Sequence, residues 1–300
     1  MRTLLSFFFS QLVVIILINF YYYGKFNFTI KSMWRRNEIT FSGEEYWEEW
    51  ERDMCDNPDK DETWKYWDSL CFRKFQNFEE VRIEVLSWSP PLVIYRNFFT
   101  KKQVKNYLQL LKIQSLEEQE VVDEKGKPFI SKVRVANGTV TPFDQYPEAE
   151  SLLNTASRLI PAIDFSISED ISALSYNPGG HYAVHYDYLE YEEGSDDEFM
   201  NEFGNRMATF IMVFKKATSG GGTLFPSFGT VVRADAGDAF LWFDSKENGE
   251  MDMNVEHGGC PVYDGQKVIS TIWVRSYGQR LFQEHNRNRS FDADVLLRSY

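Results

Sequence analysis

The residues best suited to chemistry lie in one segment, Tyr182–Tyr188, whose pattern alternates as in a β-strand. Alternation places His185 and Asp187 on one face, where a histidine and a carboxylate can hold a metal ion from the same side. A third ligand must come from elsewhere, and His257 in the segment Glu256–Pro261 is the best candidate. Two histidines and one carboxylate form the facial triad of non-haem Fe(II) sites, which leaves coordination positions open.

A lysine ten residues after His257 adds a second observation. Lys267 begins an alternating apolar segment that places Lys267, Trp273 and Arg275 on one face. A lysine that projects into an apolar barrel is costly unless an anion neutralises its charge. A dicarboxylic cosubstrate whose far carboxylate meets Lys267 satisfies this requirement. The alternative is a lysine at the end of a strand that reaches solvent.

These side chains must be positioned by a mixed set of elements. Before residue 170 the patterns are those of single elements: an acidic helical stretch over 42–70, a strand over 92–95, a helix from Thr100 with Gln103 as its capping partner, and a helix over 148–160. From about Ile171 the pattern changes to short strands separated by glycine turns. The sequence therefore predicts an α+β domain with helices packed on a β-barrel.

Composition excludes several classes of protein. Acidic residues outnumber basic ones by 45 to 32, and the resulting net charge of −13 argues against a nucleic-acid partner, which needs a basic surface. Aromatic residues make up 16% of the chain, which favours a β-rich core. Three cysteines are too few for a disulfide-built scaffold or a four-cysteine zinc site.

The N-terminal region indicates the secretory pathway. Arg2 precedes an apolar run over 4–23, which is typical of a secretory signal and also long enough for an uncleaved membrane anchor. Both interpretations stay open, with a buried core helix as a third. Three N-x-[ST] sequons, at Asn27, Asn137 and Asn288, favour exposure to the lumen of the endoplasmic reticulum and predict glycosylation there.

The predicted compartment decides whether the cysteines can form disulfide bonds. In an oxidising lumen, Cys55 and Cys71 flank a polar stretch and are the natural disulfide partners, which leaves Cys260 as a free thiol. The alternative is that Cys55 and Cys71 are unrelated buried thiols.

The remaining polar features have simple interpretations. His181 and His285 are expected to be surface residues. The acidic run over 190–202 directly follows the candidate metal-binding strand, so we expect an exposed loop at the mouth of the site, with its role left open.

Longer motifs carry a resemblance to a known family. The stretch 176–188 resembles the YxxGGxYxxHxDF motif of the prolyl 4-hydroxylase family, and 257–267 resembles its HAxCPVxxGxK motif. The segments 204–209 and 221–226 match intervening family segments in the same order. Cys55 and Cys71 also stand where the collagen prolyl 4-hydroxylase α subunit has an intrachain disulfide. The similarity runs from about residue 55 to residue 279.

The resemblance implies a double-stranded β-helix, or jelly-roll, that binds Fe(II) and the cosubstrate 2-oxoglutarate and uses L-ascorbate. The iron ligands would be His185, Asp187 and His257. Lys267 would pair with the distal carboxylate of 2-oxoglutarate, with Tyr176 and Thr209 as further hydrogen-bonding partners. The implied reaction is hydroxylation of peptidyl proline at C4, with release of succinate and CO2.

The resemblance also implies a peptide groove for proline-rich or collagen-like chains, and an association with protein disulfide isomerase. The residues that match groove positions are Arg134, Glu169, Tyr182 and Trp273, and Arg275, on the same face as Trp273, is expected to contact the substrate as well. Two departures put the collagen substrate in question: family members commonly have Ile-His where this chain has Val274-Arg275, and Ala136 replaces a serine. The chain is also too short for the separate peptide-binding and dimerisation domains of collagen-type subunits.

The expected organisation is a signal peptide or anchor over 1–24, a helical N-terminal segment over 25–88, a catalytic domain over 89–280 with its iron and 2-oxoglutarate core at about 169–278, and a C-terminal tail over 281–300. Two other functions remain open. One is a lumenal 2-oxoglutarate oxygenase that acts on another peptide residue, such as lysine. The other is a catalytically silent binding module, against which the complete triad and Lys267 argue.

Overall fold

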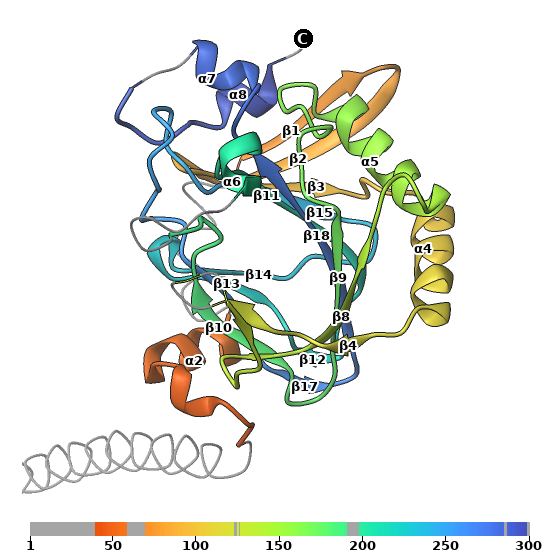
Figure 1. Cartoon of the computed structure of the whole chain (residues 1–300), viewed down its shortest axis with the longest axis vertical. Coiled ribbons are helices and arrows are strands. Elements are labelled where there is room, and N and C mark those ends of the chain that lie inside the picture. Colours follow the sequence, from red (N-terminus) through yellow and green to blue (C-terminus); the bar gives the residue numbers. More distant parts are fainter. Residues whose placement is uncertain are drawn as a thin grey trace, which may run out of the picture. The chain divides into compact units, whose positions relative to one another are not determined.

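The computed structural model describes residues 40–58, 70–122, 125, 127–190, 198–284 and 287–298. Most of the described strands belong to two antiparallel sheets (Figure 1). The larger sheet contains, in spatial order, β1 (Leu70–Gln76), β2 (Glu79–Trp88), β3 (Pro91–Arg96), β15 (Ala239–Phe243), β11 (Arg206–Lys215), β18 (Lys267–Arg275), β9 (Ile171–Tyr176), β8 (Asn137–Thr141) and β4 (Glu117–Glu118). The smaller sheet contains β14 (Thr230–Val232), β13 (Thr223–Phe225), β16 (His257–Gly259), β10 (His181–His185) and β7 (Arg134–Val135). Two short pairs complete the set: β12 (Ser219–Gly220) with β17 (Val262–Asp264), and β5 (Val121–Val122) with β6 (Pro128–Phe129).

The order in which the chain visits the two sheets identifies the fold. It runs through β9 in the larger sheet, β10 in the smaller, β11 in the larger, the β13–β14 hairpin in the smaller, β15 in the larger, β16 in the smaller and β18 in the larger. All of these strands pair antiparallel with their neighbours. This is the connectivity of a double-stranded β-helix, or jelly-roll, so the predicted fold class is confirmed.

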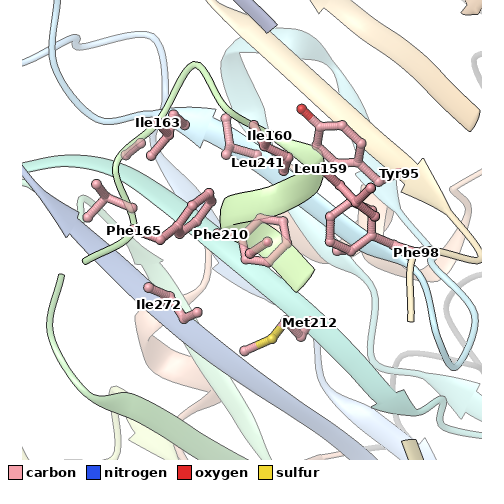
Figure 2. Packing of buried hydrophobic residues seen from close by; sticks show 14 of the residues in the cluster. Tyr95, Phe98, Leu159, Ile160, Ile163, Phe165, Phe210, Met212, Leu241 and Ile272 are labelled. Carbon is pink, nitrogen blue, oxygen red and sulfur yellow. The ribbon is translucent and has the colours of Figure 1, made fainter. Parts of the chain in front are cut away.

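One hydrophobic core lies between the larger sheet and two helices, α4 (Lys101–Ile113) and α5 (Pro147–Leu159). Figure 1 shows both helices on the same side of this sheet. Figure 2 shows Phe210 of the sheet near Leu159 of α5, and both residues belong to this core. The α4 helix begins after Thr100, whose side chain accepts from the Gln103 backbone, as the capping pattern predicts.

A second core lies between the two sheets, and alternation decides which side chains reach it. In β18, Val268, Ile272 and Val274 belong to the core against the helices, whereas Ile269 belongs to the core between the sheets. Lys267 and Trp273 share the odd-numbered positions with Ile269. The larger sheet thereby offers polar side chains to the interior of the barrel.

The segment preceding the core differs from the helical prediction for 25–88. Among its described residues only η1 (Glu44–Tyr46) and α2 (Glu49–Asp56) are helical, and the capping box of α2 is formed by Glu48 with Glu51. Residues 70–76 and 79–88 are strands β1 and β2. In β2 the burial alternates, with Val81, Ile83 and Val85 buried and charged residues between them, which is a strand pattern.

The predicted signal or anchor over 1–24 lies outside the described residues. Among the residues that the structure does describe, no helix is long and apolar enough to cross a membrane. The expected tail over 281–300 contributes to the core: Phe291, which precedes α8 (Asp294–Leu297), is fully buried and stacks on Phe243 with ring centroids 4.4 Å apart.

The predicted disulfide pairing is wrong. Cys55 at the end of α2 is bonded to Cys260, with their Cα atoms 5.6 Å apart, and Cys71 is an exposed free thiol. Cys71 lies in β1, at one edge of the larger sheet, whereas Cys260 directly follows β16 in the smaller sheet. The prediction paired the two cysteines that are nearest in sequence, but tertiary packing brings together two that are 205 residues apart.

The expectation of a surface position for His181 is also wrong, because the side chain is fully buried. The Trp47 indole donates to His181 Nδ1 (3.1 Å), and His181 Nε2 then donates to the Ser42 carbonyl oxygen (2.8 Å). Burial lowers the pKa of His181 to about 4. The fit is close at Gly43, where a Cβ would lie 2.7 Å from the imidazole and where φ is +92°. His285 lies outside the described residues.

Candidate metal centre and adjoining pockets

The structure brings His185, Asp187 and His257 together at one point. His185 ends β10 and His257 begins β16, and the two histidines face each other in the register of these neighbouring strands. Asp187 Oδ2 lies 3.4 Å from His257 Nε2, and Asp187 Oδ1 lies 3.7 Å from His185 Nε2. The three ligand atoms are all within 4.8 Å of one another, which suits a single metal ion.

Backbone carbonyl groups orient both imidazoles. His185 Nδ1 donates to the carbonyl oxygen of Ala183 (2.8 Å), and His257 Nδ1 donates to that of Val255 (3.1 Å). Because a carbonyl oxygen can only accept, Nδ1 carries the hydrogen and each Nε2 presents a lone pair toward Asp187. This is the arrangement by which proteins fix metal-binding histidines.

The protonation states also suit a metal. Burial, together with the nearby His257, lowers the pKa of His185. Burial opposes ionisation of Asp187, but protons on the adjacent His257 and His185 hold the pKa of its carboxyl well below the usual range, and a bound cation would take the place of these protons. Metal ligands must be neutral histidine and ionised carboxylate, so this donor set fits a divalent iron ion.

Thr209 does not occupy the position expected of a cosubstrate ligand. Its hydroxyl lies 2.8 Å from Asp187 Oδ2 and 2.8 Å from Asp244 Oδ2. Thr209 pairs with Trp273 in β18, whereas Lys267 is six residues away at the other end of that strand. At roughly 3.3 Å per residue this separation is about 20 Å, so Thr209 serves the metal ligand and not the lysine.

Lys267 is buried, with only 7% of its surface exposed. It lines a small cavity together with apolar side chains such as Val232 and Phe240 and with the cationic side chains of Lys215, Lys216 and Arg233. Its Nζ donates to the Gly222 carbonyl oxygen at 3.2 Å. Among the described residues no carboxylate forms an ion pair with Lys267. Burial lowers its pKa to about 7, so the amine is only partly protonated at neutral pH, and an incoming carboxylate would favour the protonated form.

Two hydroxyl groups adjoin this lysine. Tyr176 pairs with Lys267 across β9 and β18, and Lys267 Nζ lies 5.4 Å from the Tyr176 ring centroid. Burial raises the pKa of Tyr176 to about 12, so the phenol keeps its proton. Thr223 Oγ1 lies 3.4 Å from Lys267 Nζ. Sequence reasoning missed Thr223, although the Gly221-Gly222-Thr223 motif that contains it was already evident.

Two of the expected groove residues, Arg134 and Tyr182, lie next to the metal ligand His185. Arg134 and Tyr182 pair across β7 and β10, with the Arg134 guanidinium carbon 4.9 Å from the centre of the Tyr182 ring. The Tyr182 ring also stacks on His185, at a centroid distance of 3.6 Å.

The other expected groove residues, Glu169, Trp273 and Arg275, form one cluster with Arg206 next to Asp187. Glu169 accepts from Arg206 (2.7 Å) and from Arg275 (2.8 Å). Arg206 lies over the Trp273 ring at 3.8 Å and donates to the Asp187 carbonyl oxygen at 3.4 Å. Arg206 was not predicted, and its signal was the matched segment 204–209.

Arg275, which was expected to contact substrate, is only 4% exposed. Besides Glu169, its guanidinium donates to the Gly204 carbonyl oxygen at 2.8 Å. These contacts show Arg275 bound to protein groups, with Glu169 as its counter-charge.

The remaining predicted sites lie at the surface or outside the described part of the chain. Asn137 and Asn288 are exposed, and Asn27 lies outside the described residues. Residues 191–197 of the acidic run are likewise not described. Its C-terminal end forms α6 (Glu198–Phe203), and Asn205 donates to the carbonyl oxygen of Leu189 at 2.7 Å.

Comparison with known proteins places this geometry in a family. Residues 171–275 match the model of the 2OG-Fe(II) oxygenase superfamily. Prolyl 4-hydroxylase 5 of Arabidopsis thaliana is 30% identical over 216 residues, which cover 64% of this chain and 70% of that protein. Prolyl 4-hydroxylase subunit alpha-2 of Caenorhabditis elegans is 26% identical over 221 residues, and the chain spans 38% of its length.

A solved structure is similar as well. A viral collagen prolyl hydroxylase from Paramecium Bursaria Chlorella virus-1 matches with a TM-score of 0.45 and 18% identity, over 62% of this chain and 96% of that chain. The family itself is established by the sequence matches. The chain belongs to the prolyl 4-hydroxylase family of 2-oxoglutarate- and Fe(II)-dependent oxygenases.

Proposed function

We propose that the protein hydroxylates peptidyl proline at C4 in proline-rich or collagen-like chains, with conversion of 2-oxoglutarate to succinate and CO2. The observation that carries the proposal is the convergence of His185, Asp187 and His257 in a barrel whose interior also contains the buried Lys267. A triad alone fits many oxygenases, whereas the lysine adds a partner for a second carboxylate.

An iron ion held by the triad would supply the redox chemistry of C–H hydroxylation. The protein groups bind and orient the reactants. Lys267, Thr223 and Tyr176 would hold the distal carboxylate of 2-oxoglutarate through charge-assisted hydrogen bonds. Burial of Lys267 limits its contact with water, which strengthens this ionic contact.

Aromatic side chains next to the triad support a proline-rich substrate. Tyr182 stacks on His185. Arg206 lies over the ring of Trp273 and donates to the Asp187 carbonyl oxygen. Extended proline-rich segments dock on aromatic surfaces because their conformation is already ordered before binding. We infer that the peptide lies over these two aromatic residues, with Arg134 and Glu169 as polar neighbours.

The same proposal includes a place of action in the endoplasmic reticulum lumen or secretory pathway, with the N-terminal apolar run as a cleaved signal or as a membrane anchor. The bond between Cys55 and Cys260 supports an oxidising compartment, where such bonds persist. Ascorbate as reductant, glycosylation at the three sequons and association with protein disulfide isomerase belong to this proposal.

The test is an assay of the chain, expressed through a secretory route, with Fe(II), 2-oxoglutarate, ascorbate and (Pro-Pro-Gly) repeats. Succinate should form together with 4-hydroxyproline, identified by chromatography of the hydrolysed peptide. A matched peptide with lysine in place of the target proline is the control. Succinate formation that depends on the lysine peptide, or on neither peptide, would reject proline as the substrate.

A further inference from the structure

A buried carboxyl group lies next to the metal-binding aspartate but outside the triad. Asp244 directly follows β15 and is 1% exposed. Its Oδ2 lies 2.8 Å from Thr209 Oγ1, and the same Oγ1 lies 2.8 Å from Asp187 Oδ2. One threonine hydroxyl therefore bridges two carboxyl groups.

The number of hydrogens in this bridge is limited. A threonine hydroxyl has one hydrogen to donate and two lone pairs with which to accept. Asp187 must be ionised to bind a metal, so it can only accept, and the Thr209 hydrogen points to it. If Asp244 were also ionised, two oxygens would face each other at 2.8 Å with no hydrogen between them. The geometry therefore calls for a hydrogen on the Asp244 carboxyl.

The surroundings of Asp244 agree with this count. Burial and the charge of Asp187 raise the pKa of Asp244 well above its usual value, while the Thr209 hydroxyl and the Arg206 guanidinium act in the opposite direction. The backbone on both sides is fixed, because the Asp244 amide donates to the Met207 carbonyl oxygen at 2.7 Å and its own carbonyl oxygen accepts from Asp252 at 3.0 Å.

We propose that Asp244 is a positioning residue: a neutral carboxyl that donates to Thr209, so that Thr209 donates to Asp187 and fixes the orientation of the metal-binding carboxylate. With Oδ2 of Asp187 held in this way, Oδ1 keeps its place 3.7 Å from His185 Nε2. The inference rests on the proposed metal site. It adds two successive hydrogen bonds, from Asp244 to Thr209 and from Thr209 to Asp187, which hold one metal ligand in place. Such outer partners commonly alter metal affinity when they are removed.

The first test measures metal affinity without turnover. Metal-free protein is titrated with Co(II), followed by calorimetry and visible absorption. Asp244→Ala should weaken binding by about 10- to 100-fold, the usual range for an outer partner of a metal ligand. Asp244→Asn should stay close to the wild type because its amide N–H can donate to Thr209 in place of the carboxyl.

The matched control is Asp238→Asn. Asp238 directly precedes β15, whereas Asp244 directly follows it, and both are buried. Asp238 forms an ion pair with Arg96 at 2.8 Å, whereas Asp244 contacts Thr209. Its substitution should leave Co(II) affinity unchanged in the folded protein.

A double-mutant cycle tests the route through Thr209. Thr209→Val should weaken Co(II) binding by a similar factor, and Asp244→Ala should add no further loss in the Thr209→Val background. Wild-type affinity in Asp244→Ala, or a full additional loss in the double variant, would overturn the proposal.

Infrared difference spectra of the metal-free protein test the hydrogen directly. Asp244→Asn should remove the C=O stretch of a protonated carboxyl, whereas Asp238→Asn should remove only carboxylate bands. Loss of a carboxylate band in Asp244→Asn would overturn the proposal. Because this measurement does not use Asp244→Ala, it shows whether the Asp244 carboxyl carries a hydrogen even if that variant does not fold. A wild-type protein that fails to bind Co(II) would instead reject the proposed metal site.

Discussion

At the scale of single residues, the burial of Lys267 predicts how the binding of 2-oxoglutarate should depend on pH. Its pKa of about 7 means that the side chain loses its proton as the pH rises through neutrality in the absence of an anion. A dicarboxylate binds the protonated form, so binding above this pH requires uptake of a proton. The apparent KM for 2-oxoglutarate should therefore increase above about pH 7 in the wild type.

Substitution of this lysine gives the matching prediction. Lys267→Ala removes a buried ionic hydrogen bond to the cosubstrate, a loss of roughly 2–5 kcal/mol, which should appear mainly as a higher KM for 2-oxoglutarate. Lys267→Arg keeps a permanent charge and should flatten the pH dependence of KM. Steady-state kinetics over a pH series measures both. If the wild-type KM does not change with pH and Lys267→Ala leaves it unaltered, Lys267 does not contact the cosubstrate.

His181 gives a second pH dependence, this time of stability. Because its pKa is about 4 in the folded protein and 6.5 ordinarily, the unfolded chain binds more protons between these values. The free energy of unfolding should therefore decrease as the pH falls from 6.5 to 4, and His181→Gln should remove this contribution. Urea unfolding at several pH values measures it, and equal slopes in both proteins would contradict the burial of His181.

Residue types and spacing were sufficient to predict that His185, Asp187 and His257 meet and that Lys267 is buried. An alternating strand fixes the relative direction of His185 and Asp187 whatever lies around them. The partners of Thr209 and His181 could not be predicted in this way. They depend on register between strands and on the packing of Trp47, which are set by contacts between residues far apart in the sequence.

At the scale of elements, the disulfide joins α2 to the segment that follows β16, the strand that carries His257. Closing so long a loop restricts the unfolded chain, and removal of such a bond typically costs about 2–5 kcal/mol. Cys55→Ser should lower the free energy of unfolding by this amount, and Cys71→Ser should leave it nearly unchanged. Urea unfolding compares the two variants, and a Cys55–Cys71 peptide in a non-reducing digest would contradict the pairing.

Element prediction succeeded where local signals were strong and failed where two interpretations competed. The Thr100–Gln103 capping box correctly marked the start of α4, and glycine turns correctly marked the short strands after Ile171. Residues 70–88 were misread because acidic helical patterns precede them. Their own alternation of Val81, Ile83 and Val85 with charged residues was the stronger signal.

At the scale of the whole molecule, the site joins the two sheets. His185 and His257 come from the smaller sheet, whereas Lys267 and Thr209 come from the larger sheet. A metal that binds only the folded protein stabilises it by mass action, by about 2.7 kcal/mol at a concentration 100 times Kd. Co(II) should therefore raise Tm and a chelator should reverse the change. An equal rise in His185→Ala would place the metal elsewhere.

The most direct test of the central claim compares turnover in the wild type with that in three single variants, His185→Ala, Asp187→Ala and His257→Ala. With (Pro-Pro-Gly) repeats, the wild type should release succinate and form 4-hydroxyproline in equal amounts, and each variant should lose both products because it lacks one of the three metal ligands. If His257→Ala keeps substantial decarboxylation of 2-oxoglutarate, the metal site assigned here is wrong.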